Sequence, residues 1–381
     1  MRVFDTTLRD GDQMPGIELD FYDKIEILRA LDELGVDVIE AGFPASSEID
    51  RRAVRAAVRE ASRARIAALA RAHPRDVDEA AAAEAHIIHV FIATSDVHMK
   101  YKLRMTRDQV VERAVEAVER ARSYGATVLF SAEDATRSDP GFLVRIYRSV
   151  VEAGASYINI PDTVGTATPW YMEWLVGLIR RSLPSWVWID VHCHDDFGMA
   201  TANTLAGVRA GADGVQVTVN GFGERAGNAA LEEVVAALHY LMDRSTGIRM
   251  ELLTPVSRLV ASKFGVETPP NKAIVGRNAF AHEAGIHVHG VLKNPATYEP
   301  LPPEAVGNRR RIVLGRHSGR AAVEWALQSI GVTPEPALVK YILDRLKENA
   351  PRMKKVSEDI IVRWINEYME RRAETPYPRP V

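Results

Sequence analysis

The chain has 381 residues, of which 46% are hydrophobic and 26% are charged, and its formal net charge at pH 7 is −3. This composition is typical of a soluble globular protein with a large core. Because the charges nearly balance, they argue against a nucleic-acid-binding protein, which usually carries a strongly basic face.

The start of the chain and its cysteine content indicate where the protein works. Met1 is followed directly by "RVFDTT", without the apolar run of a signal peptide, and no stretch reaches the ~18 uninterrupted apolar residues of a membrane span. Cys193 is the only cysteine, so no internal disulfide can form, and a reducing compartment fits. We therefore predict a cytoplasmic protein without a membrane segment.

Eight short apolar runs are predicted to be strands, and segments of helical period separate them. The runs are residues 2–7, 36–42, 65–71, 86–93, 126–133, 156–163, 187–194 and 214–220. Gly35 and Gly125 stand where glycine commonly ends a helix. Eight strands that alternate with helices are typical of a TIM (β/α)8 barrel, an α/β fold of ~250 residues. The alternative, a doubly wound open sheet, usually has fewer strands.

The pattern changes after about residue 255. Residues 256–320 are rich in Pro, Gly, Asn and His and have no clean period, so we expect an irregular linker or small subdomain there. From "SGRAAVEWALQSIG" onward, amphipathic segments predict two or three helices, which form a C-terminal subdomain over 321–381. The predicted organisation is a catalytic barrel over 1–255 followed by these two parts, without a separate regulatory domain.

Two histidines one residue apart end the seventh predicted strand, in "VHCHDDFG" (191–198). Residues two apart on a strand face the same side, so His192 and His194 project together and Cys193 points away. Asp10, just past the first strand, lies on the same side of a closed barrel. Two imidazoles and a carboxylate suit Mn, Zn, Fe, Co or Mg and leave positions open for substrate or water. Hydrogen-bonded core histidines are the structural alternative.

The segment "NGFGERAGN" (220–228) follows the eighth predicted strand. Its glycines allow the backbone to approach a ligand closely, and Asn228 could bind the metal or orient one of its ligands. A glycine-rich turn before a helix is the alternative. Other polar residues lie at or near the ends of predicted strands, where a barrel has its catalytic face. They include Arg9, Glu40, Arg71, Glu133 and Thr163.

Together, "FDTTLRDGDQMPG", "HCHDDFGMATAN" and "NGFGERAGN" resemble the acyl-CoA-dependent 2-oxoacid condensing enzymes, namely the 2-isopropylmalate, homocitrate and citramalate synthases. "NKAIVGRNAFAHEAGIHVHG" and "LGRHSGR" extend the resemblance, which runs from residue 3 to about 330. It implies a TIM barrel, a divalent metal (Mn, Mg, Zn or Co) and acetyl-CoA as co-substrate. It also implies a domain-swapped homodimer, in which the segment after the barrel reaches the partner's active site.

The resemblance further implies roles for individual residues. The implied metal site consists of Asp10, His192, His194 and Asn228. Arg9 is expected to contact the carbonyl oxygen of the oxoacid. Glu133 and His287 are expected to form an acid/base pair, which suits the removal of a weakly acidic proton next to a thioester, and Tyr298 is their expected partner.

Five further positions bear on which oxoacid is used. Gln13, Ser131 and Thr163 resemble substrate-contacting positions. Homocitrate synthases place an arginine at the position of Leu129 and a histidine at that of Leu69, to receive the distal carboxylate of 2-oxoglutarate. Two leucines favour an apolar substrate side chain, since a buried carboxylate without a cation is costly. We therefore predict 2-isopropylmalate synthase activity on 2-oxoisovalerate, in leucine biosynthesis.

Other activities remain as alternatives. Homocitrate synthase, which acts on 2-oxoglutarate in lysine biosynthesis, is favoured by chain length, because many isopropylmalate and citramalate synthases carry an extra regulatory domain. The lack of that domain predicts weak or absent leucine feedback. Citramalate synthase, acting on pyruvate, is the next alternative. The roles of Asp195, where the family often has asparagine, and of Arg277 are left open.

Two further classes are disfavoured. Hydroxymethylglutaryl-CoA lyase would share the metal motif, but it needs a catalytic cysteine in a glycine-rich loop after the barrel motifs, and Cys193 lies elsewhere. A metal-binding protein without catalytic activity would be favoured if Arg9, Glu133 or His287 were missing, and all three are present.

Overall fold

The computed structural model describes residues 1–349 and 356–374 of the chain. It consists of two compact units, the first spanning Met1–Thr268 and the second beginning at Pro269. The first unit extends past the expected barrel boundary at residue 255, because α10 (Leu253–Lys263) packs against α1 (Phe21–Leu34). Each unit is described here by itself.

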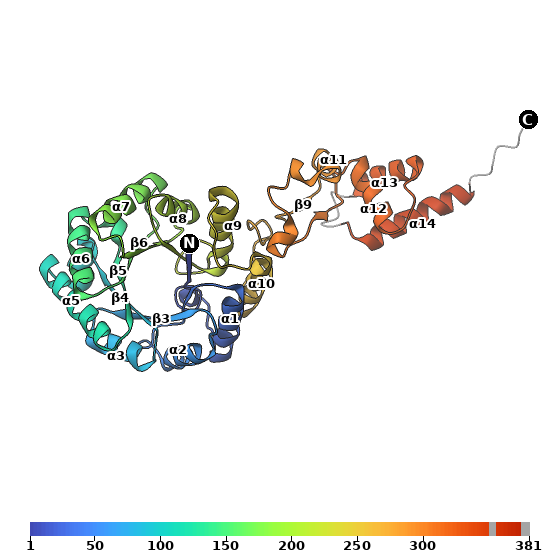
Figure 1. Ribbon diagram of the computed structural model, residues 1–381. Coiled ribbons are helices and arrows are strands. Elements are labelled where there is room, and N and C mark those ends of the chain that lie inside the picture. The colour runs from blue at the N-terminus through green and yellow to red at the C-terminus, as the bar shows by residue number, and fades with distance from the viewer. Residues whose placement is uncertain (350–355, 375–381) are drawn as a thin grey trace, which may run out of the picture. The chain divides into compact units, whose positions relative to one another are not determined.

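Eight parallel strands close into a barrel in sequence order, which confirms the predicted TIM-barrel fold (Figure 1). Every strand lies within the run of residues from which it was predicted. The strands are β1 (Arg2–Asp5), β2 (Val38–Glu40), β3 (Arg65–Arg71), β4 (Ile87–Ala93), β5 (Thr127–Glu133), β6 (Tyr157–Asp162), β7 (Trp188–Cys193) and β8 (Gly214–Val217). The ring closes where β8 pairs with β1.

Helices surround the ring of strands in Figure 1. Besides α1 and α10 they are α2 (Glu48–Glu60), α3 (Pro74–Ala82), α4 (Asp96–His98), α5 (Arg107–Ser123), α6 (Pro140–Ala153), α7 (Pro169–Ser182), α8 (Ala200–Arg209) and α9 (Leu231–Met242). Local sequence explains their ends. The side chain of Asp20 accepts a hydrogen bond from the Asp23 amide at the start of α1, and Gly35 ends that helix with a left-handed backbone (φ 97°).

Short helical turns occur in the loops of both units. They are η1 (Gly11–Gln13), η2 (Met99–Leu103), η3 (Ala135–Arg137), η4 (Val219–Gly221), η5 (Met250–Leu252), η6 (Pro295–Thr297) and η7 (Pro303–Val306). Most are 3₁₀ turns, but η2 is a π-helix, a form that often occurs at functional sites.

The second unit has a small parallel sheet and a helical core of its own. Its elements are β9 (Ala281–His282), α11 (Gly285–Lys293), β10 (Arg311–Ile312), α12 (Arg320–Ser329), α13 (Pro336–Asn349) and α14 (Glu358–Glu374). Leu327, Ile342 and Trp364 are buried in one apolar cluster, so the last three helices pack together. The chain thus continues after the barrel into a helical C-terminal region, as the sequence predicts.

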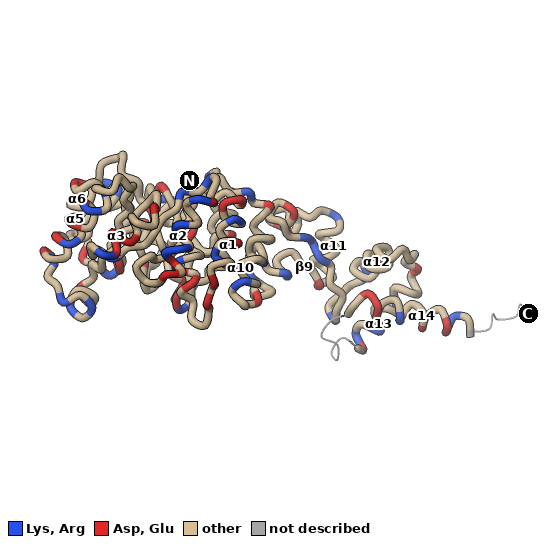
Figure 2. The backbone as a smooth tube through the Cα atoms, turned by 90° about the horizontal axis from the view of Figure 1, so that it is seen from below, with Lys and Arg blue, Asp and Glu red and all other residues tan. Residues whose placement is uncertain are grey.

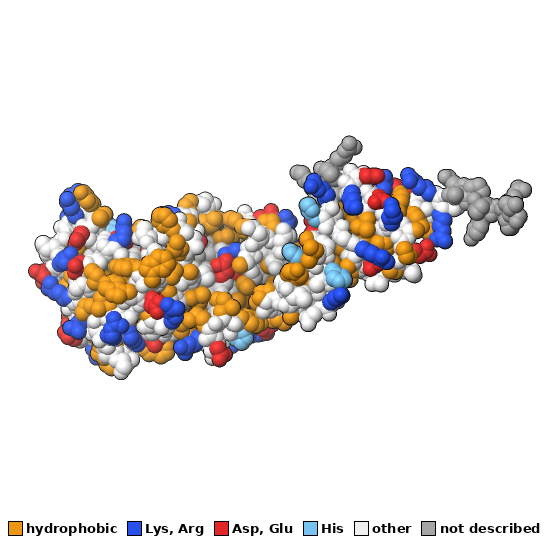
Figure 3. Space-filling model, turned by 90° about the horizontal axis from the view of Figure 1, so that it is seen from above, with side chains coloured by type: hydrophobic (Ala, Val, Ile, Leu, Met, Phe, Trp, Pro, Cys, Tyr) orange, Lys and Arg blue, Asp and Glu red, His pale blue; other side chains and the backbone are white. Residues whose placement is uncertain are grey.

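The surface of the barrel unit mixes both signs of charge. Acidic and basic residues intermingle along helices such as α1 and α2 (Figure 2), and an ion pair between Arg29 and Glu60 joins these two helices. On the face seen in Figure 3, apolar side chains lie between the charged ones. Among the described residues, none of the helices combines the length and apolar character that crossing a membrane requires.

Side chains inside the barrel change from apolar to polar along the strands. A buried apolar cluster consists of Phe4, Val38, Ala67, Ile87 and Leu129. The residues two positions further along four of these strands are Glu40, Leu69, His89 and Ser131. Because side chains two apart on a strand face the same side, these four residues form the next layer inside the barrel. The apolar cluster therefore lies one layer below these residues inside the barrel, and we call it the apolar floor of the site.

Candidate active site and metal centre

A cavity of about 320 Å³ lies at the carboxyl ends of the barrel strands. This is the end at which TIM-barrel enzymes have their active sites, and the volume suits a small molecule. The predicted site residues that line it are Arg9, Asp10, Gln13, Leu69, Ser131, Glu133, Thr163, His192 and His194. The structure thus brings together most of the residues predicted for the barrel.

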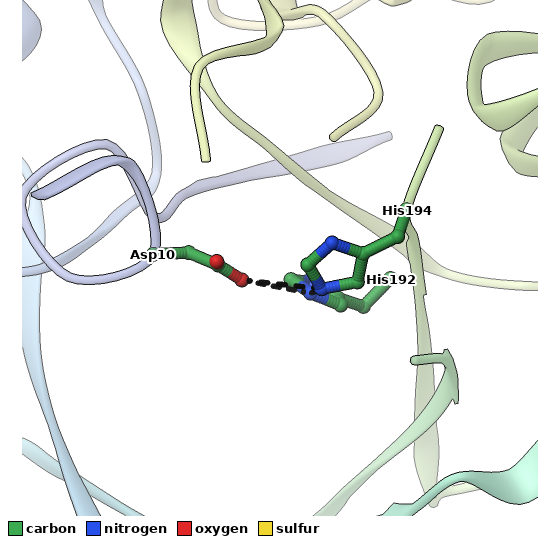
Figure 4. Close-up of side chains that lie close together, drawn as sticks. All are labelled: Asp10, His192 and His194. Atoms are coloured by element: carbon green, nitrogen blue, oxygen red, sulfur yellow. Dashed lines mark hydrogen bonds and ion pairs between the residues drawn. The ribbon is translucent and has the colours of Figure 1, made fainter. Parts of the chain in front are cut away.

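Asp10, His192 and His194 converge in this cavity (Figure 4). The Nε2 atoms of the two histidines lie 3.3 Å apart. Asp10 Oδ2 lies 3.1 Å from Nε2 of His192 and 3.6 Å from Nε2 of His194. Within the described part of the chain, this is the one group of acidic, histidine or cysteine side chains close enough to hold a metal ion. Two imidazole nitrogens and a carboxylate oxygen facing a common centre are a typical donor set for a divalent transition metal.

The electrostatics of this group suit metal binding. Burial lowers the pKa of His194 to about 4, so its imidazole is neutral at pH 7, the form that binds metals. Burial alone would raise the pKa of Asp10, but the Arg9 guanidinium and a hydrogen bond from His192 hold it well below its usual range. A neutral imidazole and an ionised carboxylate are therefore both present at neutral pH.

Asn228 lies beside this group without lining the cavity. Its Oδ1 atom is buried and has no hydrogen-bond partner among the described residues, and its Nδ2 atom donates to the Phe222 carbonyl over 3.4 Å. A Cβ atom added at Gly223 would lie 2.1 Å from Asn228 Nδ2 and 3.5 Å from Asp10 Oδ1, so the amide is next to the acid. A buried oxygen without a partner is costly, and a ligand at the cluster would relieve that cost.

Substitution of Gly223 by alanine tests the role of this amide. The added methyl group must push Asn228 aside, and we expect the affinity for Mn²⁺ to fall ~tenfold, as for other groups that support metal ligands. Titration calorimetry measures this affinity. Gly177→Ala, in α7, is the control and should bind Mn²⁺ like the wild type. Equal affinities for both variants would show that the Asn228 amide has no part in the site.

A buried network of ion pairs and hydrogen bonds extends from Asp10 to Ser131 in the cavity wall. Arg9 pairs with Asp10 (Nη1–Oδ2, 3.0 Å) and, through Nε, with Glu40. The other oxygen of Glu40 contacts His89 Nδ1, and His89 Nε2 lies 2.6 Å from the hydroxyl of Ser131. Burial would raise the pKa of Glu40, but Arg9 and His89 lower it to about 2. Arg9 is thereby held at a fixed place beside Asp10.

Three residues of this hydrogen-bonded network were not predicted as site residues. Glu40 is predicted only as the end of a strand, and no prediction covers His89 or Asn159, whose Nδ2 donates to Ser131 Oγ over 2.8 Å. The register of the barrel, which pairs Leu69 with His89, brings them together. The signal that could have found His89 is its position inside the apolar run "HIIHVFIA", where a histidine needs a buried partner.

Glu133 and Thr163 line the cavity at the ends of β5 and β6. Lys102 Nζ, from η2, lies 2.6 Å from Glu133 Oε1, and this partner was also not predicted. Thr163 Oγ1 accepts a hydrogen bond from the Asp134 amide over 2.9 Å. This bond fixes the end of β6 against the turn that follows Glu133.

The structure differs from the sequence-based expectation at two positions of the barrel. Leu129 does not line the cavity, because it belongs to the apolar floor one layer below Ser131. Arg71 is at the end of β3, but its side chain is 61% exposed and pairs with Asp76. Neither residue is therefore in a position to contact a small ligand in this cavity.

Other residues singled out from the sequence have identifiable surroundings. Asp195 Oδ1 accepts a hydrogen bond from the Ala200 amide at the start of α8. Cys193 is a free, fully buried thiol, as the alternation along β7 predicts, and burial raises its pKa. In the second unit, the rings of His287 and Tyr298 lie 4.4 Å apart, and both side chains are exposed. The catalytic roles expected of this pair stay predictions.

A parallel eight-stranded barrel with two histidines and an aspartate gathered at the carboxyl ends of its strands places the protein in the TIM-barrel class. Within this class, the chain belongs to the HMGL-like family, whose model matches residues 1–260. Residues 274–354 match the homocitrate synthase post-HMGL domain-like family.

Curated relatives cover nearly the whole chain. A probable 2-isopropylmalate synthase of Ignicoccus hospitalis is 53% identical over 98% of this chain and 93% of its own length. Homocitrate synthase AksA of Methanopyrus kandleri is 48% identical over 99% of this chain and 94% of its own. (R)-citramalate synthase CimA of Methanocaldococcus jannaschii is 49% identical over 96% of this chain and 74% of its own. The three names differ in the oxoacid that they imply.

Solved structures support the fold. A structure of an HMG-CoA lyase from Acenitobacter baumannii, in complex with coenzyme A and 3-methylmalate, superimposes with a TM-score of 0.65. It is 22% identical in sequence and covers 74% of this chain and 97% of that one. At this level of identity the likeness concerns the fold alone.

Proposed function

We propose that the protein condenses acetyl-CoA with a 2-oxoacid in a metal-dependent reaction and then hydrolyses the thioester, with 2-isopropylmalate synthase as its activity. The observation that carries the proposal is the cluster of Asp10, His192 and His194 beside Arg9, at one end of a cavity that fits a small oxoacid. Several relatives that are about half identical over most of the chain are named 2-isopropylmalate synthases.

The residues of the cavity, together with His287 of the second unit, suit the condensation step of this reaction. A divalent ion at the cluster would act as a Lewis acid on the oxoacid. Arg9 donates to the ketone oxygen, where negative charge develops, and Glu40 keeps the guanidinium in place. Glu133, aided by His287, takes a proton from the methyl group of acetyl-CoA, and the resulting enolate carbon forms a bond to the ketone carbon. The alkoxide takes up a proton, and water cleaves the thioester into a carboxylate and the CoA thiol.

The cavity wall favours an oxoacid with an apolar side chain. Phe43, Leu69 and Phe91 contribute apolar surface to it. Its arginines and its lysine are each paired with a carboxylate: Arg9 with Glu40, Lys102 with Glu133 and Arg225 with Asp196. A second substrate carboxylate would therefore lack a free guanidinium or ammonium partner on this wall, which favours 2-oxoisovalerate over 2-oxoglutarate.

Release of CoA from acetyl-CoA, measured with Mn²⁺ or Mg²⁺ across three oxoacids, tests this preference. We expect kcat/KM for 2-oxoisovalerate to exceed that for 2-oxoglutarate at least ~tenfold, the cost of one unpaired buried charge, with pyruvate between them. Leu69→His should narrow this ratio, whereas Leu241→His, on the exposed face of α9, should leave it unchanged.

Two results would contradict the assignment. A preference for 2-oxoglutarate would make the protein a homocitrate synthase, and a preference for pyruvate would make it a citramalate synthase. CoA release in the absence of any oxoacid would contradict the condensation itself. A lack of CoA release with all three oxoacids would contradict it as well.

We also propose that the protein is a cytoplasmic homodimer in which the second unit of one chain completes the site of its partner. The proposal rests on the family resemblance and on the presence of His287 and Tyr298 outside the barrel unit, which holds the metal cluster. The native metal is proposed to be Mn, Mg, Zn or Co, which the donor set alone does not distinguish.

A further inference from the structure

One buried lysine joins two loops at the mouth of the cavity. The first loop, between β1 and α1, carries Arg9, Asp10 and Gln13, and the second, between β2 and α2, carries Phe43. Lys24, in the first turns of α1, lies beneath both loops and is only 2% exposed. Lysine is almost never buried to this extent unless it is paired, so its partners define what it does.

The ammonium group of Lys24 has three acceptors, one for each of its N–H groups. Nζ lies 2.7 Å from Asp12 Oδ2 and 2.6 Å from Asp50 Oδ1, and it donates to the Leu8 carbonyl over 3.3 Å. Leu8 and Asp12 bracket Arg9 and Asp10 in the chain. Lys24 therefore holds both ends of the turn that presents the predicted metal ligand and the predicted oxyanion contact.

Asp50 carries the connection to the second loop. Its other oxygen, Oδ2, accepts hydrogen bonds from the Phe43 amide and from the Ser46 hydroxyl, both over 3.0 Å. A Cβ atom at Gly42 would lie 3.1 Å from Asp50 Cγ, so the loop passes directly over this carboxylate. Hydrogen bonds and ion pairs through Lys24 and Asp50 thus connect the turn that carries Asp10 with Phe43 in the cavity wall.

The contacts of Lys24 suit the positioning of the two loops better than they suit a contribution to the folding stability of the protein. Burial alone would lower the pKa of Lys24, but Asp50 and Asp12 raise it, so the group stays charged. A buried ion pair gives little net stability over apolar side chains of similar size, whereas its short directional contacts fix the geometry of the groups that it joins. Contacts on both sides of a metal ligand affect how well that ligand is oriented.

We propose that Lys24 is a positioning residue, which holds the turn with Arg9 and Asp10 in place relative to Phe43 on the apolar side of the cavity. It thereby sets both the affinity for the metal and the KM for the oxoacid. This inference rests on the proposed function, because it assigns to Lys24 an effect on the same site. It predicts that the lysine acts on one substrate only, since acetyl-CoA supplies no group that the turn at Arg9 and Asp10 is expected to hold.

The test compares Lys24→Met with Lys263→Met in the full-length protein. Lys263 also pairs with two carboxylates, Asp23 and Glu26 on the same helix α1, but it lies on the outer surface at α10. For Lys24→Met we expect the Kd for Mn²⁺ and the KM for 2-oxoisovalerate to rise ~tenfold to hundredfold, while the KM for acetyl-CoA changes less than ~twofold. Lys263→Met should match the wild type, and Lys24→Arg, which keeps the charge, should recover part of the loss.

Thermal unfolding of the metal-free variants separates positioning from folding. Equal Mn²⁺ affinity and oxoacid KM in folded Lys24→Met and wild type would overturn the inference, whatever the loss of stability. If Lys24→Met does not fold, Asp50→Asn carries the test, because it weakens the link to Phe43 and leaves Lys24 paired with Asp12. An unchanged oxoacid KM in that variant would likewise overturn it. Failure of the wild type to bind Mn²⁺ or to release CoA would instead refute the proposed function.

Discussion

Replacing His192 by alanine is expected to remove metal binding and catalytic turnover together. The substitution deletes one of three donor atoms that lie within 4.8 Å of one another, so the remaining imidazole and carboxylate form a much weaker site. Loss of the ion removes the group expected to polarise the oxoacid, and we expect kcat/KM to fall by at least ~10³-fold. Metal content after dialysis and CoA release in the presence of 2-oxoisovalerate measure the two effects on the same sample.

The control for this substitution is His239→Ala. His239 is exposed on α9, and its ring lies 4.7 Å from that of Tyr240. It should leave both metal content and turnover at wild-type levels. Turnover that survives in His192→Ala after the metal is lost would show that the ion is not required for the reaction.

Replacing Glu133 by glutamine is expected to separate metal binding from catalysis. The carboxylate lines the cavity and contacts Lys102, and it is not part of the metal cluster, so the Kd for Mn²⁺ should stay unchanged. An amide cannot accept the methyl proton of acetyl-CoA, and kcat should fall ~10²-fold to 10⁴-fold. Exchange of the methyl protons of acetyl-CoA into deuterated water reports the same step directly.

Glu224→Gln is the matched control, because Glu224 also lines the cavity but lacks a predicted role. It should retain most of the activity. Loss of metal from Glu133→Gln would instead assign Glu133 to the support of the metal site. Undiminished turnover in Glu133→Gln would exclude it as the base.

Mixing two inactive variants extends this experiment to the proposed dimer. Glu133→Gln alters the barrel unit, and His287→Ala alters the second unit. If each site combines units from both chains, random mixed dimers contain one intact site, and the mixture should recover roughly a quarter of the wild-type activity. A mixture that stays inactive would indicate that each chain supplies its own histidine.

Local sequence patterns were sufficient to predict the barrel. Each of the eight strands lies within its predicted run, because buried parallel strands read as short apolar segments between helical ones. The same patterns predicted that His192 and His194 face one side, since a period of two fixes their direction. Asp10 could be added because the first and last strands of a closed barrel are neighbours.

The depth of a side chain inside the barrel could not be read in the same way. Alternation along β5 predicts that Leu129 points inward, but the stagger between strands decides whether an inward residue reaches the cavity. Leu129 pairs in register with His89 and lies in the floor. The contact between His89 and Glu40 has the same origin, because it joins residues of strands that are far apart in the sequence.

Lys24 shows a second limit of sequence patterns. In "FYDKIEILRALDELG" Lys24 stands three, four and seven residues before Ile27, Leu28 and Leu31, so the helical period places this charged residue on the apolar face. The period does not predict its partners, because Asp12 and Asp50 come from segments without a periodic pattern. Long-range contacts of this kind depend on the tertiary structure.

The isolated thiol of Cys193 makes the protein well suited to chemical labelling. A thiolate is the form that reacts with thiol reagents, and burial with a raised pKa keeps this one unreactive. Colorimetric detection of CoA should therefore have no background from the folded enzyme. A cysteine introduced at the exposed Ile286, next to His287, would be the one reactive position among the described residues, so a fluorophore would label the second unit at a single site.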